Sequence, residues 1–284
     1  MNRTIIVMLG LSLIACTSKG KKTKKTPEKA PTMVRVWDTK GFKVPESVMY
    51  DPKSQLLFVS NIGGNPTQKN KNGFIATVNL MGVTQNPFWL TGLNAPKGMG
   101  ILGETLYVTD IDRVIAINIP KAAIEKTWTV EGAKFLNDIA IGGDGSVFIT
   151  DMMAKKIHII KGGQLDTFLV LQYDRPNGLF TTGSTLWVGT ALGLVKIDTR
   201  SKTITLEIDH KGGIDGLKAL GDGGFLVSDW KGKVEIIKKG KAPVVLSDTS
   251  HEKINAADFE FIPQKNLIIV PTFFDNRIVA YQLR

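Results

Sequence analysis

Six polar residues occupy one equivalent position in a phrase that recurs along the chain. Each stands just ahead of an apolar β-type run, and successive members are 38 to 51 residues apart: Glu46, Lys97, Asp138, Asn177, Asp215 and Asp258. We call these six the anchor residues. Four of them are carboxylic acids, so a fold that brings the six positions together must relieve the repulsion between several acidic groups.

A bound cation would relieve that repulsion. Carboxylate and amide oxygens are the ligands that hard ions such as Ca²⁺ and Mg²⁺ prefer. The three histidines (His158, His210 and His251) all lie away from the anchor positions, which argues against a histidine-rich zinc centre. We therefore expect one divalent cation, with Ca²⁺ ahead of Mg²⁺, Mn²⁺ or Zn²⁺. The alternative is that the anchor residues cap strand starts by accepting bonds from neighbouring backbone N–H groups.

The phrase belongs to a longer repeat that predicts an all-β fold. After each anchor residue the chain passes through a turn and reaches a second strand-like run, such as LFVSN, LYVTD, VFITD or FLVSD. Third and fourth runs rich in Val, Ile, Thr and aromatic residues follow. Four short strands in roughly 40 residues, repeated six times, are typical of a six-bladed β-propeller with four antiparallel strands in each blade.

The two ends of the repeat region predict how the ring closes. The sixth copy ends at Arg284 without a fourth strand, whereas MVRVWD, residues 33–38, is a strand-like run outside the first copy. We expect this N-terminal strand to complete the last blade, because closure removes an open sheet edge. The propeller would then span residues 33–284. Since the first strand of each blade lines the central channel, the anchor residues should converge near one end of that channel.

The N-terminus has the pattern of a bacterial lipoprotein signal. Arg3 precedes an apolar run over residues 5–14, which is too short for a permanent membrane span, and the run ends in LIAC. We expect residues 1–16 to be the signal peptide and Cys16, the only cysteine, to carry the lipid. Because Thr17 rather than aspartate follows, we expect a lipid-anchored envelope protein on the periplasmic or surface side, in the outer membrane where the organism has one.

Residues 17–32 are predicted to be a lysine-rich linker. The formal net charge of the chain is +10, and six lysines and one glutamate of the linker, together with Arg3, supply most of it. The predicted propeller therefore carries little net charge, and we expect no nucleic-acid partner. A basic tether is suited to lie beside anionic lipid headgroups. The sequence indicates no particular protein partner.

At the anchor residues the chain resembles the regucalcin and gluconolactonase (senescence marker protein) family of six-bladed propellers. The resemblance rests on Glu46 in PESV, Asn137 in FLND, Asn177 in PNGL and Asp215 in IDGL, which follow one another in the order of the family. It implies that Glu46, Asn177 and Asp215 bind a divalent metal and that Asn137 lies near metal and substrate. It also implies a lactonase or related ester hydrolase in which Asp215 activates water or accepts a proton.

Two positions depart from the family pattern. Phe135 stands where family members often have an arginine that contacts a sugar, and Lys97 places an ammonium group at an anchor position. We expect Asn137, Asp138, Lys97 and Phe135 to form the substrate side of the site, with a small molecule more apolar than a sugar lactone. The alternative is a non-catalytic propeller that binds a ligand or protein at the envelope, with Lys97 replacing the metal.

Two further features bear on the site. Residues 61–73 form a polar insertion between the second and third strands of the first copy, and we expect either a lid near the cation or a surface loop. Four tryptophans recur in the predicted strands, and we expect them in the core between blades rather than at a ligand: Trp89, Trp128, Trp187 and Trp230.

Overall fold

The computed structural model describes Met1 and residues 30–284. The predicted lipidation site Cys16, the rest of the predicted signal peptide after Met1, and residues 17–29 of the predicted linker lie outside the described residues. Residues 31–284 form one compact unit. Within the described part of the chain, no helix has both the length and the apolar character that a membrane span requires.

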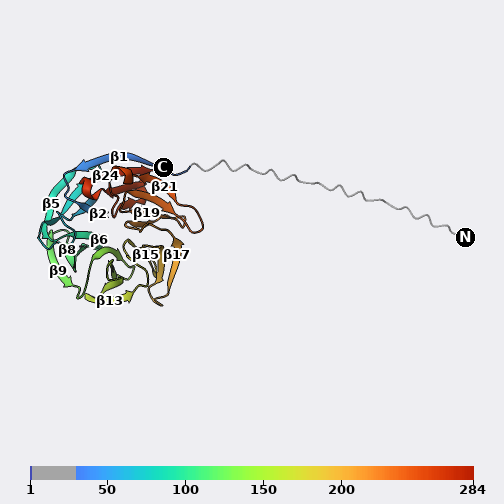
Figure 1. Cartoon of the computed structure of the whole chain (residues 1–284), viewed down its shortest axis with the longest axis horizontal. Helices are drawn as coiled ribbons and strands as arrows, with labels where there is room; N and C mark the ends of the chain where they lie inside the picture. Colours follow the sequence, from blue (N-terminus) through green and yellow to red (C-terminus); the bar gives the residue numbers. More distant parts are fainter. Residues whose placement is uncertain (2–29) are drawn as a thin grey trace. The chain divides into compact units, whose positions relative to one another are not determined.

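Six four-stranded antiparallel sheets follow one another around a ring (Figure 1). Blade 1 consists of β2 (Pro45–Asp51), β3 (Leu56–Asn61), β4 (Gly73–Asn79) and β5 (Thr84–Leu93). Blade 2 consists of β6 (Pro96–Leu102), β7 (Thr105–Asp110), β8 (Arg113–Asn118) and β9 (Ala123–Thr129). Blade 3 consists of β10 (Leu136–Ile141), β11 (Val147–Asp151), β12 (Lys156–Lys161) and β13 (Gln164–Val170).

Blades 4 and 5 repeat this order, and blade 6 combines both ends of the compact unit. Blade 4 consists of β14 (Leu179–Thr182), β15 (Thr185–Thr190), β16 (Gly193–Asp198) and β17 (Ile204–Asp209). Blade 5 consists of β18 (Leu217–Ala219), β19 (Phe225–Asp229), β20 (Lys233–Ile237) and β21 (Val244–Asp248). Blade 6 consists of β22 (Glu260–Ile262), β23 (Leu267–Pro271), β24 (Arg277–Leu283) and β1 (Met33–Lys40). Three short 3₁₀ helices lie in the connections of this region: η1 (Ser250–Glu252), η2 (Pro263–Lys265) and η3 (Phe273–Asp275).

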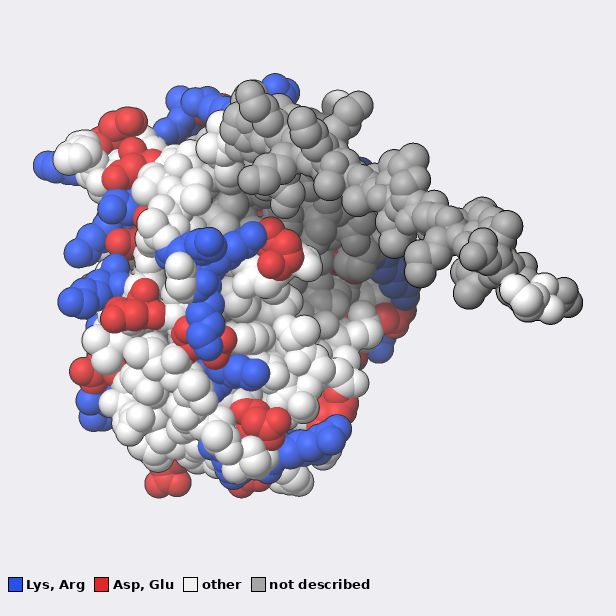
Figure 2. Space-filling view, turned by 90° about the vertical axis from the view of Figure 1, so that its right-hand side faces the viewer, with Lys and Arg blue, Asp and Glu red and all other residues white. Residues whose placement is uncertain are grey.

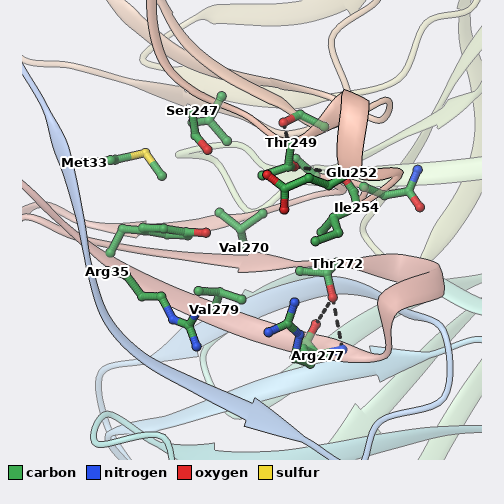
Figure 3. Close-up of a pocket in the computed structure, with 15 residues that line it drawn as sticks. Met33, Arg35, Ser247, Thr249, Glu252, Ile254, Val270, Thr272, Arg277 and Val279 are labelled. Carbon is green, nitrogen blue, oxygen red and sulfur yellow. Dashed lines mark hydrogen bonds between the residues drawn. The ribbon is translucent and has the colours of Figure 1, made fainter.

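The predicted fold is confirmed, including closure of the ring by the N-terminal strand. β1 pairs antiparallel with β24 from Met33↔Leu283 to Lys40↔Arg277. The Arg277 Nη1 atom lies 2.9 Å from Asp38 Oδ2 and so ties the two strands together. Figure 3 shows Arg277 in a cavity of about 120 Å³ between blades 5 and 6, which contains none of the anchor residues.

The hydrophobic core lies between the blades, because both faces of each sheet are covered. In β3, Leu57 and Val59 belong to a cluster shared with blade 6, whereas Phe58 belongs to a cluster shared with blade 2. This alternation follows the two-residue period of a β-strand. Figure 2 shows basic and acidic side chains mixed over the face in view, without a continuous area of one sign.

Glycines directly after three anchor residues allow the first strands of neighbouring blades to approach closely. A Cβ added to Gly98 would lie 2.5 Å from Asp138 Cα, and one added to Gly178 would lie 2.3 Å from the Asp215 carbonyl oxygen. A Cβ on Gly216 would lie 2.5 Å from the Phe259 ring. These distances are shorter than any normal carbon contact, so the recurring glycine is a packing requirement of the channel.

Candidate functional site

A cavity of about 310 Å³ opens at the end of the channel where the first strands begin. It is lined by six of the residues predicted for the site: Glu46, Lys97, Phe135, Asn137, Asn177 and Asp215. Glu46 lies in β2, Lys97 in β6 and Asn137 in β10. Asn177 and Asp215 lie two residues ahead of β14 and β18, so these two anchor residues precede their strands rather than beginning them.

Asp138 is buried and does not line the cavity. Its two carboxylate oxygens accept bonds from the backbone N–H groups of Leu179 (2.6 Å) and Ile139 (2.7 Å). The neighbouring Asn137 lines the cavity instead. Of the adjacent pair, Asn137 is therefore the residue available to a ligand, and Asp138 joins blades 3 and 4.

Glu46, Asn177 and Asp215 line the cavity, and each carries side-chain oxygen atoms. Asn177 Nδ2 donates a bond of 2.7 Å to Asp215 Oδ1. Glu46 Oε2 and Asn177 Oδ1 are buried and have no hydrogen-bond partner among the described residues. An unpartnered buried oxygen is rare, and a cation or water is its usual complement.

The chemistry of these residues fits a hard cation. The described residues contain no group of three or more His, Cys, Asp or Glu side chains placed to hold a metal, so carboxylates alone would not form the site. Two carboxylates, Glu46 and Asp215, and two amide oxygens, from Asn137 and Asn177, could hold an ion. Oxygen ligands of this mixed kind suit Ca²⁺ or Mg²⁺.

Burial and mutual repulsion raise the pKa values of the acids at this end of the channel. Burial first, and then the charge of Asp215, raise the pKa of Glu46 well above its usual range. Burial and the charge of Asp258 raise the pKa of Asp215 to about 7. Both acids would ionise more readily beside a positive charge. A cation bound here would therefore be stabilised by the two carboxylates.

Lys97 places one positive charge near the Glu46 carboxylate. Its side chain is 1% exposed. Its Nζ atom donates bonds of 3.1 Å to the carbonyl oxygens of Pro66 and Ala95 and lies 4.5 Å from the centre of the Phe135 ring. Burial lowers the pKa of Lys97 to about 8, although the charge of Glu46 opposes the shift.

Below the cavity the channel contains its own charge network. Asp258 Oδ2 accepts a bond of 2.5 Å from Ser47 Oγ, while its Oδ1 has no partner among the described residues. Lys218 Nζ lies 4.0 Å from Glu260 Oε1. Burial alone would lower the pKa of Lys218, but the charges of Glu260, Asp258 and Asp138 raise it, so Lys218 is the cation of the inner channel.

The insertion over residues 61–73 contributes to the cavity. Ile62 and Pro66 line it, and Lys97 is bonded to the carbonyl oxygen of Pro66. Lys69 forms an ion pair with Asp112, which joins the insertion to the turn after β7. The insertion is therefore a wall of the site rather than a loop remote from it.

The sequence interpretation of Trp230 was wrong. Trp89, Trp128 and Trp187 pack against buried clusters of the core, whereas Trp230 is 42% exposed in the turn after β19 and lines the cavity. It contacts the rings of Phe273 (5.4 Å between centres) and Phe274 (6.0 Å). The prediction failed because Trp230 directly follows the end of a strand, where the alternation of buried positions stops.

A sequence signal for this apolar lining does exist. In each of the six copies the second strand ends in a polar residue or is directly followed by one. The next residue is apolar in every copy: Ile62, Ile111, Met152, Ala191, Trp230 and Phe273. The second strand ends on the side where the first strand begins, so all six residues lie near the anchor residues. Four of them line the main cavity, and Ala191 lines an adjoining cavity of about 260 Å³.

Solved structures share this fold at low sequence identity. A catalytically inactive variant of virginiamycin B lyase from Staphylococcus aureus, solved with quinupristin, superposes with a TM-score of 0.61 at 13% identity, covering 89% of this chain and 99% of that chain. A streptogramin B lyase superposes with a TM-score of 0.62 at 12% identity, covering 89% of this chain and 97% of that chain. A protein assigned as a gluconolactonase superposes with a TM-score of 0.64 at 16% identity, covering 89% of this chain and 92% of that chain.

These similarities define the class of the protein by its fold alone. The chain is a six-bladed propeller structurally similar to senescence marker protein/gluconolactonase structures and to virginiamycin B lyase. No protein-family profile and no curated protein matches the sequence.

Proposed function

We propose that the protein is a divalent-metal-dependent hydrolase of the lactonase or esterase type. The observation that carries this proposal is the pair of buried oxygens, Glu46 Oε2 and Asn177 Oδ1, which lack partners among the described residues in a cavity also lined by Asp215. The resemblance of the PESV, FLND, PNGL and IDGL phrases to the gluconolactonase family, and the fold shared with a protein assigned to it, support the same reaction class.

In this proposal Glu46, Asn177 and Asp215 hold the cation, and Asn137 orients the substrate. When bound, the cation supplies Lewis acidity toward an ester carbonyl. Beside the cation the Asp215 carboxyl would be ionised, and its carboxylate would accept a proton from the attacking water. The Asn177 amide holds that carboxylate in place through the 2.7 Å bond.

The decisive experiment measures metal content and ester hydrolysis on the same samples. We expect elemental analysis and calorimetry to find one divalent ion per chain, and we expect Glu46→Ala and Asp215→Ala to lose it. We also expect turnover of simple lactones or aryl esters to fall at least a hundredfold in both variants, as when a group that stabilises the transition state is removed. Asp144→Ala, which removes an exposed carboxylate far from the cavity lining, is the control.

The alternative function is a non-catalytic propeller that binds a small ligand or a protein. The observation that favours it is Lys97, a buried ammonium group whose charge acts on Glu46. If the native protein, shown to be folded by its cooperative unfolding, binds none of Ca²⁺, Mg²⁺, Mn²⁺ or Zn²⁺ at millimolar concentration, Lys97 neutralises the cluster and the hydrolase proposal fails.

We place the protein at the bacterial cell envelope, anchored through a lipid on Cys16. The support is the LIAC phrase after an apolar run. Metabolic labelling with a radioactive fatty acid should mark the native protein, and Cys16→Ala should release it from the membrane fraction. Labelling that persists in Cys16→Ala would contradict this assignment.

A further inference from the structure

The polar groups of the cavity are accompanied by an aromatic wall. Phe273 and Phe274 lie with ring centres 4.7 Å apart, and both contact Trp230. Phe273 is buried, whereas Trp230 is 42% and Phe274 58% exposed. Large aromatic side chains that remain exposed beside a cavity, rather than scattered singly over the surface, indicate a surface that a ligand covers.

Two polar groups of the cavity are already engaged in contacts within the protein. Lys97 Nζ is already bonded to two carbonyl oxygens and lies over Phe135. The Asn177 amide is bonded to Asp215. Arg175 and Asn137 also line the cavity and can meet polar groups of a ligand. The aromatic wall offers a hydroxyl group no partner, so a hydroxyl placed against it is costly to desolvate. An apolar substituent would gain by covering the same wall.

We infer that the ligand of this site is an ester or lactone with an apolar aliphatic or aromatic substituent, which packs on Trp230, Phe273 and Phe274. The ester part of this inference rests on the proposed function. The apolar part rests only on the lining of the cavity, and the two parts can be tested separately.

Lactams test recognition without turnover, because an amide ring resists hydrolysis. The probes are 6-pentylpiperidin-2-one, which carries an alkyl chain, and gluconolactam, which carries hydroxyl groups on the same six-membered ring. By calorimetry we expect the pentyl lactam to bind the native protein at least tenfold more tightly than gluconolactam. We expect Trp230→Ala and Phe274→Ala each to lower the affinity of the protein for the pentyl lactam by about tenfold.

Phe88→Ala is the matched control. Phe88 has the same 58% exposure as Phe274 and also contacts another phenylalanine, Phe74, at 4.9 Å, but it lies in β5 outside the cavity. We expect Phe88→Ala to leave the affinity unchanged. Tighter binding of gluconolactam, or equal effects of Phe274→Ala and Phe88→Ala, would overturn the inference.

Hydrolysis of δ-decalactone, the ester counterpart of the pentyl lactam, separates this inference from the proposed function. If the protein binds the pentyl lactam through Trp230 and Phe274 but leaves δ-decalactone intact, the apolar recognition stands and the hydrolase proposal is wrong. If δ-decalactone is hydrolysed but the pentyl lactam binds no better than gluconolactam, the hydrolase proposal stands and the apolar recognition is wrong.

Discussion

Lys97 is the residue whose charge decides between the two functions considered. It is buried, bonded to the carbonyl oxygens of Pro66 and Ala95, and close enough to Glu46 for the two charges to affect each other's pKa. An ammonium group and a divalent cation would compete for the same carboxylates. The hydrolase proposal therefore requires the site to tolerate both charges at once.

We predict that Lys97→Met increases the affinity of the protein for Ca²⁺ by about tenfold, because removal of a neighbouring positive charge favours a second cation. Calorimetric titration at pH 7 measures this. The control is Lys196→Met, since Lys196 also lies over an aromatic ring, that of Trp187 at 5.8 Å, but is remote from the cavity lining. Unchanged or weaker Ca²⁺ binding in Lys97→Met would mean that Lys97 supports the site instead.

At the scale of the strand, the glycine after the anchor residue decides how closely neighbouring blades approach. Gly178 lies against the backbone of Asp215, two residues ahead of the first strand of the next blade around the channel. The contact involves backbone atoms, which cannot move aside as a flexible side chain could. A methyl group at this position would therefore separate two first strands at the site itself.

We predict that Gly178→Ala lowers the free energy of unfolding by about 1–3 kcal/mol, as overpacking of a core does. Gly143→Ala is the control, because a Cβ at Gly143 meets no atom within 4 Å, and its effect should stay below about 1 kcal/mol. Urea unfolding followed by fluorescence measures both. Equal stability of the two variants would show that the first strands can shift apart freely.

The whole ring depends on a strand contributed from the other end of the compact unit. β1 supplies the outer strand of blade 6 and is held by its pairing with β24 and by the ion pair of Asp38 with Arg277. Without it, β24 would be an open edge.

We predict that a chain beginning at Gly41 unfolds at least about 10 °C below a chain beginning at Pro31, since one strand of pairing and part of a core cluster are lost. Calorimetry of the two chains tests this, and the chain from Pro31 serves as the control because it retains β1. Identical midpoints would mean that β1 contributes little to closure.

The acids of the channel should make stability depend on pH. Burial raises the pKa of Asp258 to about 6 from a usual value near 3.8. The folded protein thus binds this proton more tightly than the unfolded chain, so the stability that the group contributes is full below about pH 4 and is lost as pH rises through 6.

We predict that Asp258→Asn is more stable than the native protein at pH 8 and that this advantage disappears by pH 4. The asparagine is neutral at every pH, and its carbonyl oxygen can still accept the bond from Ser47 Oγ. Urea unfolding at pH 4, 6 and 8 measures the difference. A constant difference across these values would show that the Asp258 carboxyl is ionised throughout, with Lys218 as its partner.

Local sequence patterns were sufficient to predict the blades and the closure of the ring. Strand formation depends on alternating apolar residues and on turn residues, both of which can be read along the chain, and the six copies repeat them at similar spacing. The recurrence of the anchor residues also predicted which ends of the strands come together, because equivalent positions in equivalent blades face the same end of the channel.

Which of these residues reach the cavity depended on tertiary structure. The pairing of first and second strands is irregular beside the anchor residues of blades 1, 2 and 3, between Pro45 and Ser47, Pro96 and Met99, and Leu136 and Ile139. A bulge rotates the side chains that follow it, so the two-residue period cannot say that Asn137 rather than Asp138 lines the cavity. The aromatic wall comes from turns, where no periodicity exists, and only the packing of six blades brings Trp230 and Phe274 beside Glu46.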